Sequence, residues 1–190
     1  MPRIIAGEWG GRRLVVASDA TRPTSDRVRE ALFAALESRV DLTDMTVVDL
    51  FAGTGALGLE AVSRGAASAV LVDADRRAVD GLKRNVAACG AEQRVRVVAA
   101  TATDFLRAAG EQRYDLVFCD PPYDLADDEL AQVLALVGEH LGDGYLVLER
   151  AKRAAPTVWP STLSPVLAKR YGDTRVEWAQ SCSDSDAATS

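Results

Sequence analysis

Residues 46–58 read TVVDLFAGTGALG, and this stretch predicts how the rest of the chain is arranged. A β-branched run at 46–48 leads to Asp49, and Gly53, Gly55 and Gly58 follow before apolar residues return at helical spacing. A strand, a glycine turn and a helix N-terminus in this order present bare backbone and unpaired N–H groups to a ligand. We therefore expect a nucleotide-like cofactor at this turn.

Two cofactors fit the glycine pattern. The glycines spell G-x-G-x-x-G, and Asp73 lies where the ribose-binding acid of a dinucleotide site stands, about 20 residues further on. Asp49 favours another choice, because its carboxylate would repel a pyrophosphate but attract a ligand with an ammonium group and no phosphate. S-adenosylmethionine has those properties and NAD does not. The alternatives are that Asp49 caps a helix or loop and that the glycines form an ordinary turn.

Strand and helix patterns alternate along the body of the chain. Apolar runs predict further strands at 69–73, 94–99, 114–119 and 144–149, and an antiparallel pair at 166–171 and 174–178. We expect an α/β fold with a doubly wound, Rossmann-like, seven-stranded and mostly parallel sheet. Four polar residues should then meet at its carboxyl edge: Asp49, Asp73, Thr101 and Asp120.

Length and composition exclude several classes of protein. With 190 residues, 48% of them hydrophobic, the chain is long enough for one α/β domain and short for two. It has no apolar run of about 18 residues and no signal-peptide pattern, so we expect a cytoplasmic protein without a membrane partner. Cys89, Cys119 and Cys182 have no C-x-x-C spacing, which predicts neither disulfides nor a metal site. His140, the only histidine, is expected to be structural.

Basic residues gather at the start of an acidic chain. The net charge is −6, yet six arginines stand against three acids in residues 1–29, which gives that segment +3 and the remainder −9. Because screening limits the reach of each charge to about 8–10 Å at physiological salt, such a patch can bind phosphate on an acidic protein. The alternative is a solvated surface. The arginines are Arg3, Arg12, Arg13, Arg22, Arg27 and Arg29.

The N-terminal segment is predicted to form a β-hairpin, with β-prone runs at 3–7 and 12–16. We expect few core contacts to hold it. Ser25 and Asp26 then cap a helix that runs to Arg39. Arg27 and Arg29 fall outside its apolar face and are predicted to be free for solvent or a ligand. That face comprises Val28, Ala31, Leu32, Ala35 and Leu36.

The tetrapeptide Asp120-Pro121-Pro122-Tyr123, which follows the strand at 114–119, is predicted to carry the chemistry. Its prolines fix the backbone and remove two N–H donors, which leaves carbonyl acceptors beside a carboxylate and an aromatic ring. Such a group can accept both hydrogens of an exocyclic amine and direct the nitrogen lone pair at a methyl sulfonium, while the base stacks on Tyr123. The alternative is a proline turn that only ends the strand.

The motif VVDLFAGTGALG together with DPPY resembles the class I S-adenosylmethionine-dependent amino-methyltransferases. Three further segments are similar to the bacterial RsmD family, which methylates N2 of a guanine in 16S ribosomal RNA. These are RIIAGEWGGRRL at 3–14, RPTSDRVREALF at 22–33 and KRYGDT at 169–174. The resemblance extends from Arg3 to about Trp178. RPTSDRVRE is the more specific element, since DPPY also occurs in DNA adenine methyltransferases.

The resemblance implies which residues form the site. It assigns RNA contacts to the six N-terminal arginines, catalysis to Asp120, Pro121, Pro122 and Tyr123, and cofactor contacts to Asp49, Phe51, Gly53, Gly55, Asp73, Ala74, Ala102 and Asp120. Two positions depart from the family pattern. Asp73 is shorter than the usual glutamate, and Thr101 stands where an Asp or Asn often contacts adenine. We then expect the adenine contact on the backbone at Ala102.

Three hypotheses about function follow. The leading one is a monomeric enzyme that methylates N2 of a guanine in 16S ribosomal RNA, either as naked RNA or within an assembling small ribosomal subunit. It divides the chain into an RNA-binding extension at 1–20, a methyltransferase domain at 21–180 and a disordered tail at 181–190. An adenine-N6 DNA methyltransferase is disfavoured, because 190 residues leave no room for a target-recognition domain. The third hypothesis is a non-catalytic RNA-binding assembly factor on the same fold.

Overall fold

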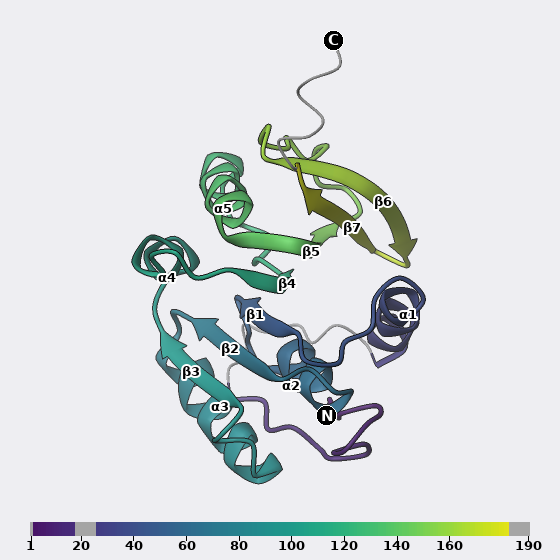
Figure 1. Ribbon diagram of the computed structural model, residues 1–190, viewed down its shortest axis with the longest axis vertical. Coiled ribbons are helices and arrows are strands. Elements are labelled where there is room, and N and C mark those ends of the chain that lie inside the picture. Colours follow the sequence, from purple (N-terminus) through teal and green to yellow (C-terminus); the bar gives the residue numbers. More distant parts are fainter. Residues whose placement is uncertain (1, 18–25, 183–190) are drawn as a thin grey trace.

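A seven-stranded sheet forms the centre of the computed structural model, which describes residues 2–17 and 26–182 (Figure 1). The strand order is β3-β2-β1-β4-β5-β7-β6. Strands β1 to β5 pair in parallel, and β7 is antiparallel to both β5 and β6. This confirms the predicted doubly wound, mostly parallel sheet. The strands are β1 (Thr46–Leu50), β2 (Ser68–Asp73), β3 (Val95–Ala99), β4 (Tyr114–Cys119), β5 (Leu141–Ala151), β6 (Leu163–Tyr171) and β7 (Thr174–Ser181).

Helices cover both faces of the sheet, as Figure 1 shows. One apolar core contains residues of α1, α2, α3 and the N-terminal segment, and the other contains residues of α4 and α5. Strands buried on both faces are typical of parallel sheets, and β1 and β4 have this character. The helices are α1 (Asp26–Glu37), α2 (Ala56–Ser63), α3 (Arg76–Cys89), α4 (Ala102–Ala108) and α5 (Asp127–His140).

Several element ends differ from prediction. Helix α1 ends at Glu37 rather than Arg39, and α5 passes directly into β5, which begins at Leu141 rather than at the predicted residue 144. Strand β6 begins at Leu163, before the predicted start, because an edge strand tolerates Pro165 and the register shifts beside it. Strand β7 runs to Ser181, so that residue does not belong to the predicted tail. Arg22, the Ser25 cap and residues 183–190 lie outside the described residues.

The buried face of α1 matches the predicted one only in part. Arg29 and Phe33 are buried together with Leu32, Ala35 and Leu36, whereas Val28 and Ala31 are half-buried. Phe33 packs against Phe118 of β4, with ring centroids 5.7 Å apart, and this contact turns the helix toward the sheet. The prediction that Arg29 is free for solvent is therefore wrong, while Arg27 is exposed as expected.

The N-terminal segment, residues 2–17, is a hairpin in outline and is called the arm below. Its two halves run antiparallel through a bridge between Arg3 and Arg13, but neither half is a regular strand. Ile4, Trp9 and Leu14 are buried in the same core as α1 and α2. The expectation that few core contacts hold the arm is therefore wrong.

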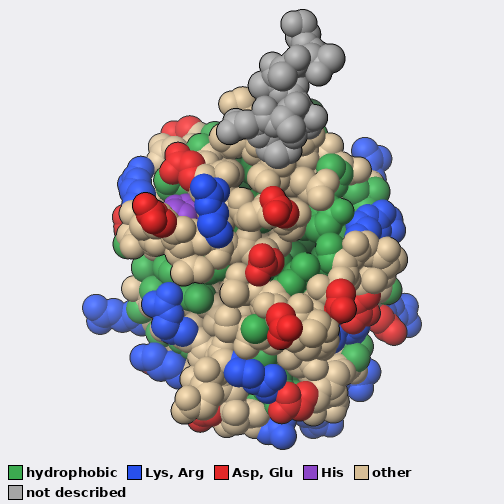
Figure 2. All heavy atoms as spheres, in the orientation of Figure 1, with side chains coloured by type: hydrophobic (Ala, Val, Ile, Leu, Met, Phe, Trp, Pro, Cys, Tyr) green, Lys and Arg blue, Asp and Glu red, His purple; other side chains and the backbone are tan. Residues whose placement is uncertain are grey.

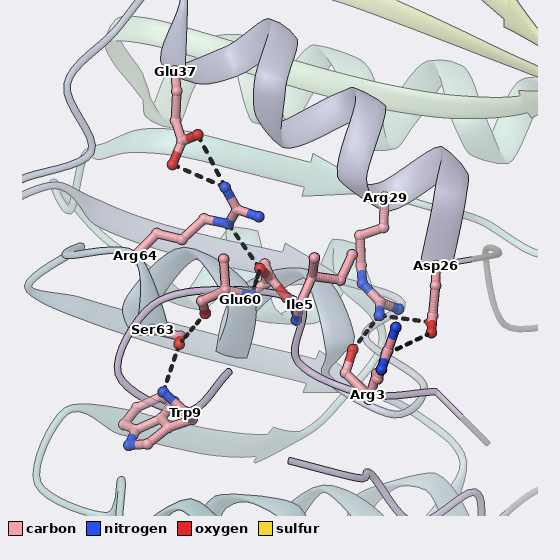
Figure 3. A network of polar contacts seen from close by, with 10 residues as sticks. Arg3, Ile5, Trp9, Asp26, Arg29, Glu37, Glu60, Ser63 and Arg64 are labelled. Carbon is pink, nitrogen blue, oxygen red and sulfur yellow. Dashed lines mark hydrogen bonds and ion pairs between the residues drawn. The ribbon is translucent and has the colours of Figure 1, made fainter. Parts of the chain in front are cut away.

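Two side chains of α2 hold the arm by its backbone (Figure 3). Glu60, which is fully buried, accepts hydrogen bonds from the N–H groups of Ile5 at 2.6 Å and Ala6 at 3.0 Å. Ser63 Oγ accepts one from the N–H of Trp9 at 2.9 Å. Because these donors belong to an irregular segment, the side-chain acceptors take the place of the missing strand partners.

Several smaller predictions about the fold can also be compared with the structure. Cys89 and Cys119 are buried and free, and burial raises the pKa of both thiols. His140 Nδ1 lies 2.9 Å from the carbonyl oxygen of Gln112, which confirms its structural position. Within residues 2–17 and 26–182, no helix combines the length and the apolar character needed to cross a membrane.

Candidate active site

The carboxyl edge of the sheet opens onto a pocket of about 550 Å³. This volume lies within the range of about 300–1,000 Å³ that is usual for small-molecule and cofactor sites. The meeting of the four polar residues at this edge is confirmed, since all of them line the pocket. The predicted residues on its wall are Asp49, Phe51, Asp73, Ala74, Thr101, Ala102, Asp120, Pro121, Pro122 and Tyr123.

The glycine turn shapes the pocket without forming its wall. Gly53 and Gly55 both have positive φ, at 55° and 75°, as the sequence pattern requires. The wall itself is made by their neighbours Ala52, Thr54 and Ala56. Phe51 also has a positive φ of 61°, a conformation uncommon for residues other than glycine, and it lines the pocket.

The N–H groups of the three glycines are already hydrogen-bonded within the protein. Gly53 donates to Asp73 Oδ2 at 2.8 Å, Gly55 to the carbonyl of Ala52 at 2.7 Å, and Gly58 to Asp49 Oδ2 at 2.9 Å. These three N–H groups are therefore not available to a ligand. A dinucleotide site needs such donors for its pyrophosphate, so this geometry disfavours NAD.

Asp49 is a buried carboxyl group on the pocket wall, with 1% of its surface exposed. Its bond to Gly58, the third residue of α2, satisfies one N–H group in the first turn of that helix, although Gly55 rather than Asp49 is the N-cap residue. Burial raises the pKa of Asp49 to about 8, an effect that the Gly58 bond opposes and the nearby charge of Asp73 reinforces. A cation bound beside it would favour ionisation again.

Gly58 lets α2 approach β1 closely. A Cβ atom added there would lie 2.3 Å from Leu71 Cδ2 and 3.2 Å from Asp49 Cβ. This glycine therefore serves helix–strand packing, and it brings its N–H to the carboxylate of Asp49.

Asp73 ends β2 and joins two loops of the pocket. Oδ2 holds Gly53, and Oδ1 accepts from the N–H of Asp75 at 2.9 Å. Asp75 in turn caps α3 by accepting from Arg77 N–H at 2.8 Å, as its sequence position predicts. The carboxylate of Asp73 thus lies on the pocket wall with its orientation fixed by backbone bonds.

The Asp120–Tyr123 segment forms the opposite part of the wall. Asp120 follows β4 directly, beside the glycine turn that follows β1. Pro121 is buried and Pro122 is exposed. Tyr123 lines the pocket although 55% of its surface is exposed, which places its ring at the pocket mouth. A planar group entering the pocket would meet this ring first.

Thr101 acts as a helix cap at the far end of the pocket. Its hydroxyl accepts from the N–H of Asp104 at 3.1 Å, at the start of α4. Ala102, the first residue of that helix, lines the pocket beside it. The hydroxyl that departs from the family pattern is therefore already used for a structural contact.

Acidic side chains outnumber basic side chains on the pocket wall. Among the described residues, Arg29 is the one basic side chain of the pocket. Sequence reasoning did not place Arg29 in this pocket, because the residue lies outside the apolar stripe expected for its helix and was assigned to RNA. Glu149, at the end of β5, was also missed. The acidic residues of the wall are Asp49, Asp73, Asp75, Asp120, Asp124, Glu129 and Glu149.

The predicted RNA-binding arginines are divided by the structure. Arg3, Arg12, Arg13 and Arg27 are exposed, and the bridge in the arm places Arg3 opposite Arg13. Arg29 is buried, with 1% of its surface exposed. On the face of the molecule that Figure 2 shows, acidic and basic side chains are interspersed.

A further basic group, absent from the predicted site residues, lies where the end of β5 meets the turn between β6 and β7, and it is called the tip below. Ala151 of β5 pairs with Thr174 of β7, two strands from Asp120 and at the same edge of the sheet. All four of its basic side chains are exposed, and none forms an ion pair with another described residue. They are Lys152, Arg153, Lys169 and Arg170.

No group of three or more potential metal ligands occurs in the part of the chain that the structure describes.

The sequence matches the family model described as conserved hypothetical protein 95 over residues 2–180. The chain belongs to this family. Its motifs and its relatives confirm the resemblance to RsmD proteins.

Several relatives of this chain are named as methyltransferases. The ribosomal RNA small subunit methyltransferase D of Escherichia coli K12 is 47% identical over 122 residues, which are 64% of this chain and 60% of that protein. The chain therefore aligns with about three fifths of the Escherichia coli relative. The protein of the same name from Haemophilus influenzae is 34% identical over 174 residues, 90% of this chain and 89% of that protein.

A solved structure supports the fold assignment. The yhhF protein of Escherichia coli superposes with a TM-score of 0.80 at 36% identity, over 95% of this chain and 97% of that one. The sheet order is that of the class I methyltransferase fold.

Proposed function

We propose that this protein transfers the methyl group of S-adenosylmethionine to the N2 amine of a guanine in 16S ribosomal RNA. The observation that carries the proposal is the Asp120–Tyr123 segment on the wall of an acidic pocket, in a chain whose relatives are named ribosomal RNA small subunit methyltransferases. The two halves of the proposal, cofactor and acceptor, have separate support.

The charges of the pocket support the cofactor. S-adenosylmethionine carries an ammonium and a sulfonium, and seven carboxyl groups line this pocket against one guanidinium. Asp49 lies buried beside the glycine turn, where the ammonium of the cofactor would favour its ionised form. Two backbone bonds fix the carboxylate of Asp73 on the pocket wall, which supports the proposal that it accepts from the ribose hydroxyls. The residues present therefore fit this cofactor.

The segment after β4 supports transfer to an amine on a planar base. S-adenosylmethionine supplies an electrophilic methyl group. The carboxylate of Asp120 and the carbonyl oxygens of the proline segment accept hydrogen bonds from the amine and so hold its lone pair toward the methyl carbon. Tyr123 at the mouth offers a stacking surface for a base turned out of its helix. The N–C bond would form as the S–CH₃ bond breaks and S-adenosylhomocysteine leaves, and the methylated amine would lose its proton to water, so no strong general base is required.

Two basic groups support an RNA acceptor. Arg3 and Arg13 lie opposite each other on the arm, and the four basic residues of the tip lie at the edge of the sheet that carries Asp120. Phosphate contacts of this kind supply affinity and orientation, whereas the base is recognised in the pocket. The acceptor named for the relatives, ribosomal RNA, fits such a surface.

The test is methyl transfer from radiolabelled S-adenosylmethionine. Naked 16S RNA, small-subunit particles and adenine-containing DNA serve as acceptors, and nucleoside analysis identifies the product. We expect N2-methylguanosine in RNA from the wild-type protein and none from Asp120→Ala. Methyladenine in DNA would support the DNA enzyme instead. RNA binding without any transfer would support the assembly factor.

A further inference from the structure

The guanidinium of Arg29 is buried with two of its nitrogens unpaired. Nη2 donates to the backbone carbonyl of Arg3 and to Asp26 Oδ1, as Figure 3 shows. Nε and Nη1 are buried and have no hydrogen-bond partner among the described residues. Buried polar groups are almost always satisfied, and an uncompensated buried charge is costly. Two unsatisfied donors on a cation therefore indicate a site for an acceptor, and an anion suits it best.

The carboxylates near this cation are shared with other groups. Burial lowers the pKa of Arg29, while the charges of Asp26 and Glu60 oppose that effect. Glu60, however, is engaged by the arm and by Arg64 Nε at 2.7 Å. Asp26 is shared with Arg3, whose Nε lies 3.3 Å from Oδ2. Since a guanidinium stays protonated in proteins, Arg29 presents a positive charge to the pocket.

A positive charge is needed where the pocket would hold the amino-acid end of the cofactor. The cofactor proposed above ends in an amino acid, which carries a carboxylate next to its ammonium. Seven acidic side chains line the pocket and would repel that carboxylate. Among the described residues of the wall, Arg29 is the one that can attract it. Asp49 and Arg29 together provide opposite charges for the two ends of a zwitterion.

We propose that Arg29 is the carboxylate-binding residue of this pocket and holds the amino-acid end of S-adenosylmethionine through its unpaired N–H groups. This inference rests on the proposed cofactor and goes beyond it, since it assigns to Arg29 a ligand other than RNA. The hydrogen bond from Arg29 to the backbone carbonyl of Arg3, a residue of the arm, holds the guanidinium in position. Arg29 thereby links the arm to the cofactor.

The test compares two ligands that differ in the carboxylate alone, S-adenosylmethionine and its decarboxylated analogue. We expect calorimetry to show that wild-type protein prefers the first by at least about tenfold, a range typical of a charge-assisted hydrogen bond. In Arg29→Met the preference should fall to within about threefold, with the affinity for the decarboxylated analogue nearly unchanged. Arg29→Lys keeps the charge and should keep part of the preference.

Arg64→Met is the matched control. Arg64 is also an arginine of the network beside the arm, where it binds Glu60 and Glu37, but it does not line the pocket. The control should lose stability and keep the ligand preference. Thermal unfolding checks that each variant is folded.

Three results would overturn the inference. The first is equal affinity of the wild-type protein for the two ligands, a result that can be obtained without any variant. The second is a folded Arg29→Met protein with the wild-type preference. The third is an unchanged preference together with weakened RNA binding, which would make the anion an RNA phosphate. Each is distinguishable from failure of the proposed function, because in that case the wild-type protein would transfer no methyl group to RNA.

Discussion

Asp73 Oδ2 accepts a hydrogen bond of 2.8 Å from the backbone N–H of Gly53, so the acid that ends β2 holds the turn that follows β1. Its second oxygen holds the loop that leads into α3. The carboxylate therefore organises two walls of the pocket in addition to the ligand contact proposed for it. Any substitution at this position acts on both.

Asp73→Ala should weaken binding of S-adenosylhomocysteine by about 1.5–3 kcal/mol, the range for a lost hydrogen bond to a charged group. Asp73→Asn keeps one acceptor and should lose less. Calorimetry measures both. Asp75→Ala is the control, because Asp75 lines the same pocket and caps α3. Equal losses for Asp73→Ala and Asp75→Ala would mean that loop order, rather than a ribose contact, determines the affinity.

Cofactor binding should release a proton at neutral pH. With its pKa raised to about 8, Asp49 is mostly protonated at pH 7 in the free protein, and the ammonium of the cofactor should ionise it. Calorimetry in buffers of different ionisation enthalpy should show release of close to one proton near pH 7. Near pH 9 the sign should reverse, because Asp49 is then ionised and the free α-amino group, with a pKa of about 7.7–8.0, must take up a proton.

Asp49→Asn provides the control for this linkage, because it retains an acceptor for Gly58. The release at pH 7 should disappear in this variant. Because the pKa of Asp49 is higher in the folded than in the unfolded protein, the protein without cofactor should lose stability as the pH rises from about 4 through about 8. Proton release that persists in Asp49→Asn would assign the linkage to another group.

Asp120→Ala should lower the single-turnover rate of methyl transfer by about 10²–10³-fold, the usual loss when one positioned polar contact to the reacting group is removed. Asp120→Asn keeps the size and one acceptor oxygen, so its loss should be smaller. The affinity for RNA should survive both changes. Full turnover of Asp120→Ala on a verified RNA substrate would make the segment a structural turn.

Replacing Arg3 and Arg13 with alanine should weaken RNA binding and reduce its dependence on salt. Each lost phosphate contact should lower the slope of log K against log salt by about 0.7–0.9. The affinity for the cofactor should stay nearly unchanged. Arg107→Ala with Arg113→Ala is the control, since these exposed arginines precede β4 at the opposite edge of the sheet. If both pairs leave the slope unaltered, the arm arginines form a solvated surface.

Glu60→Gln should lower the free energy of unfolding by about 3–5 kcal/mol, because it removes the charge of a fully buried group that binds Arg64 and two N–H groups of the arm. Glu37→Gln removes the exposed partner of the same arginine and should cost about 0–1 kcal/mol. Urea unfolding followed by circular dichroism measures the difference. Similar small losses in both variants would show that the arm is held mainly by its apolar residues.

The elements that could be predicted are those whose signal is local. The strand, glycine turn and helix at 46–58 and the strand at 114–119 follow from patterns within a few residues. The face of α1 could not be predicted, because it depends on packing between Phe33 and Phe118, which are distant in sequence. The burial of Arg29 follows from that packing. Without knowledge of that packing, Arg29 cannot be distinguished from the exposed arginines that were expected to contact RNA, although it lines the pocket.

The attachment of the arm to α2 and α3 has a consequence for the order in which the chain folds during synthesis. Ile5 binds Glu60, Val15 binds Asn85, and Glu8 binds Arg94, at separations of 55, 70 and 86 residues. At about 5–20 residues per second, a ribosome needs roughly 4–16 s to make the ~80 residues between the arm and the last of these partners. Ile4, Trp9 and Leu14 therefore leave the ribosome before the core that buries them exists. The arm is the first part of the fold to be made, but its hydrogen-bond partners are complete only after about half of the chain has been synthesised.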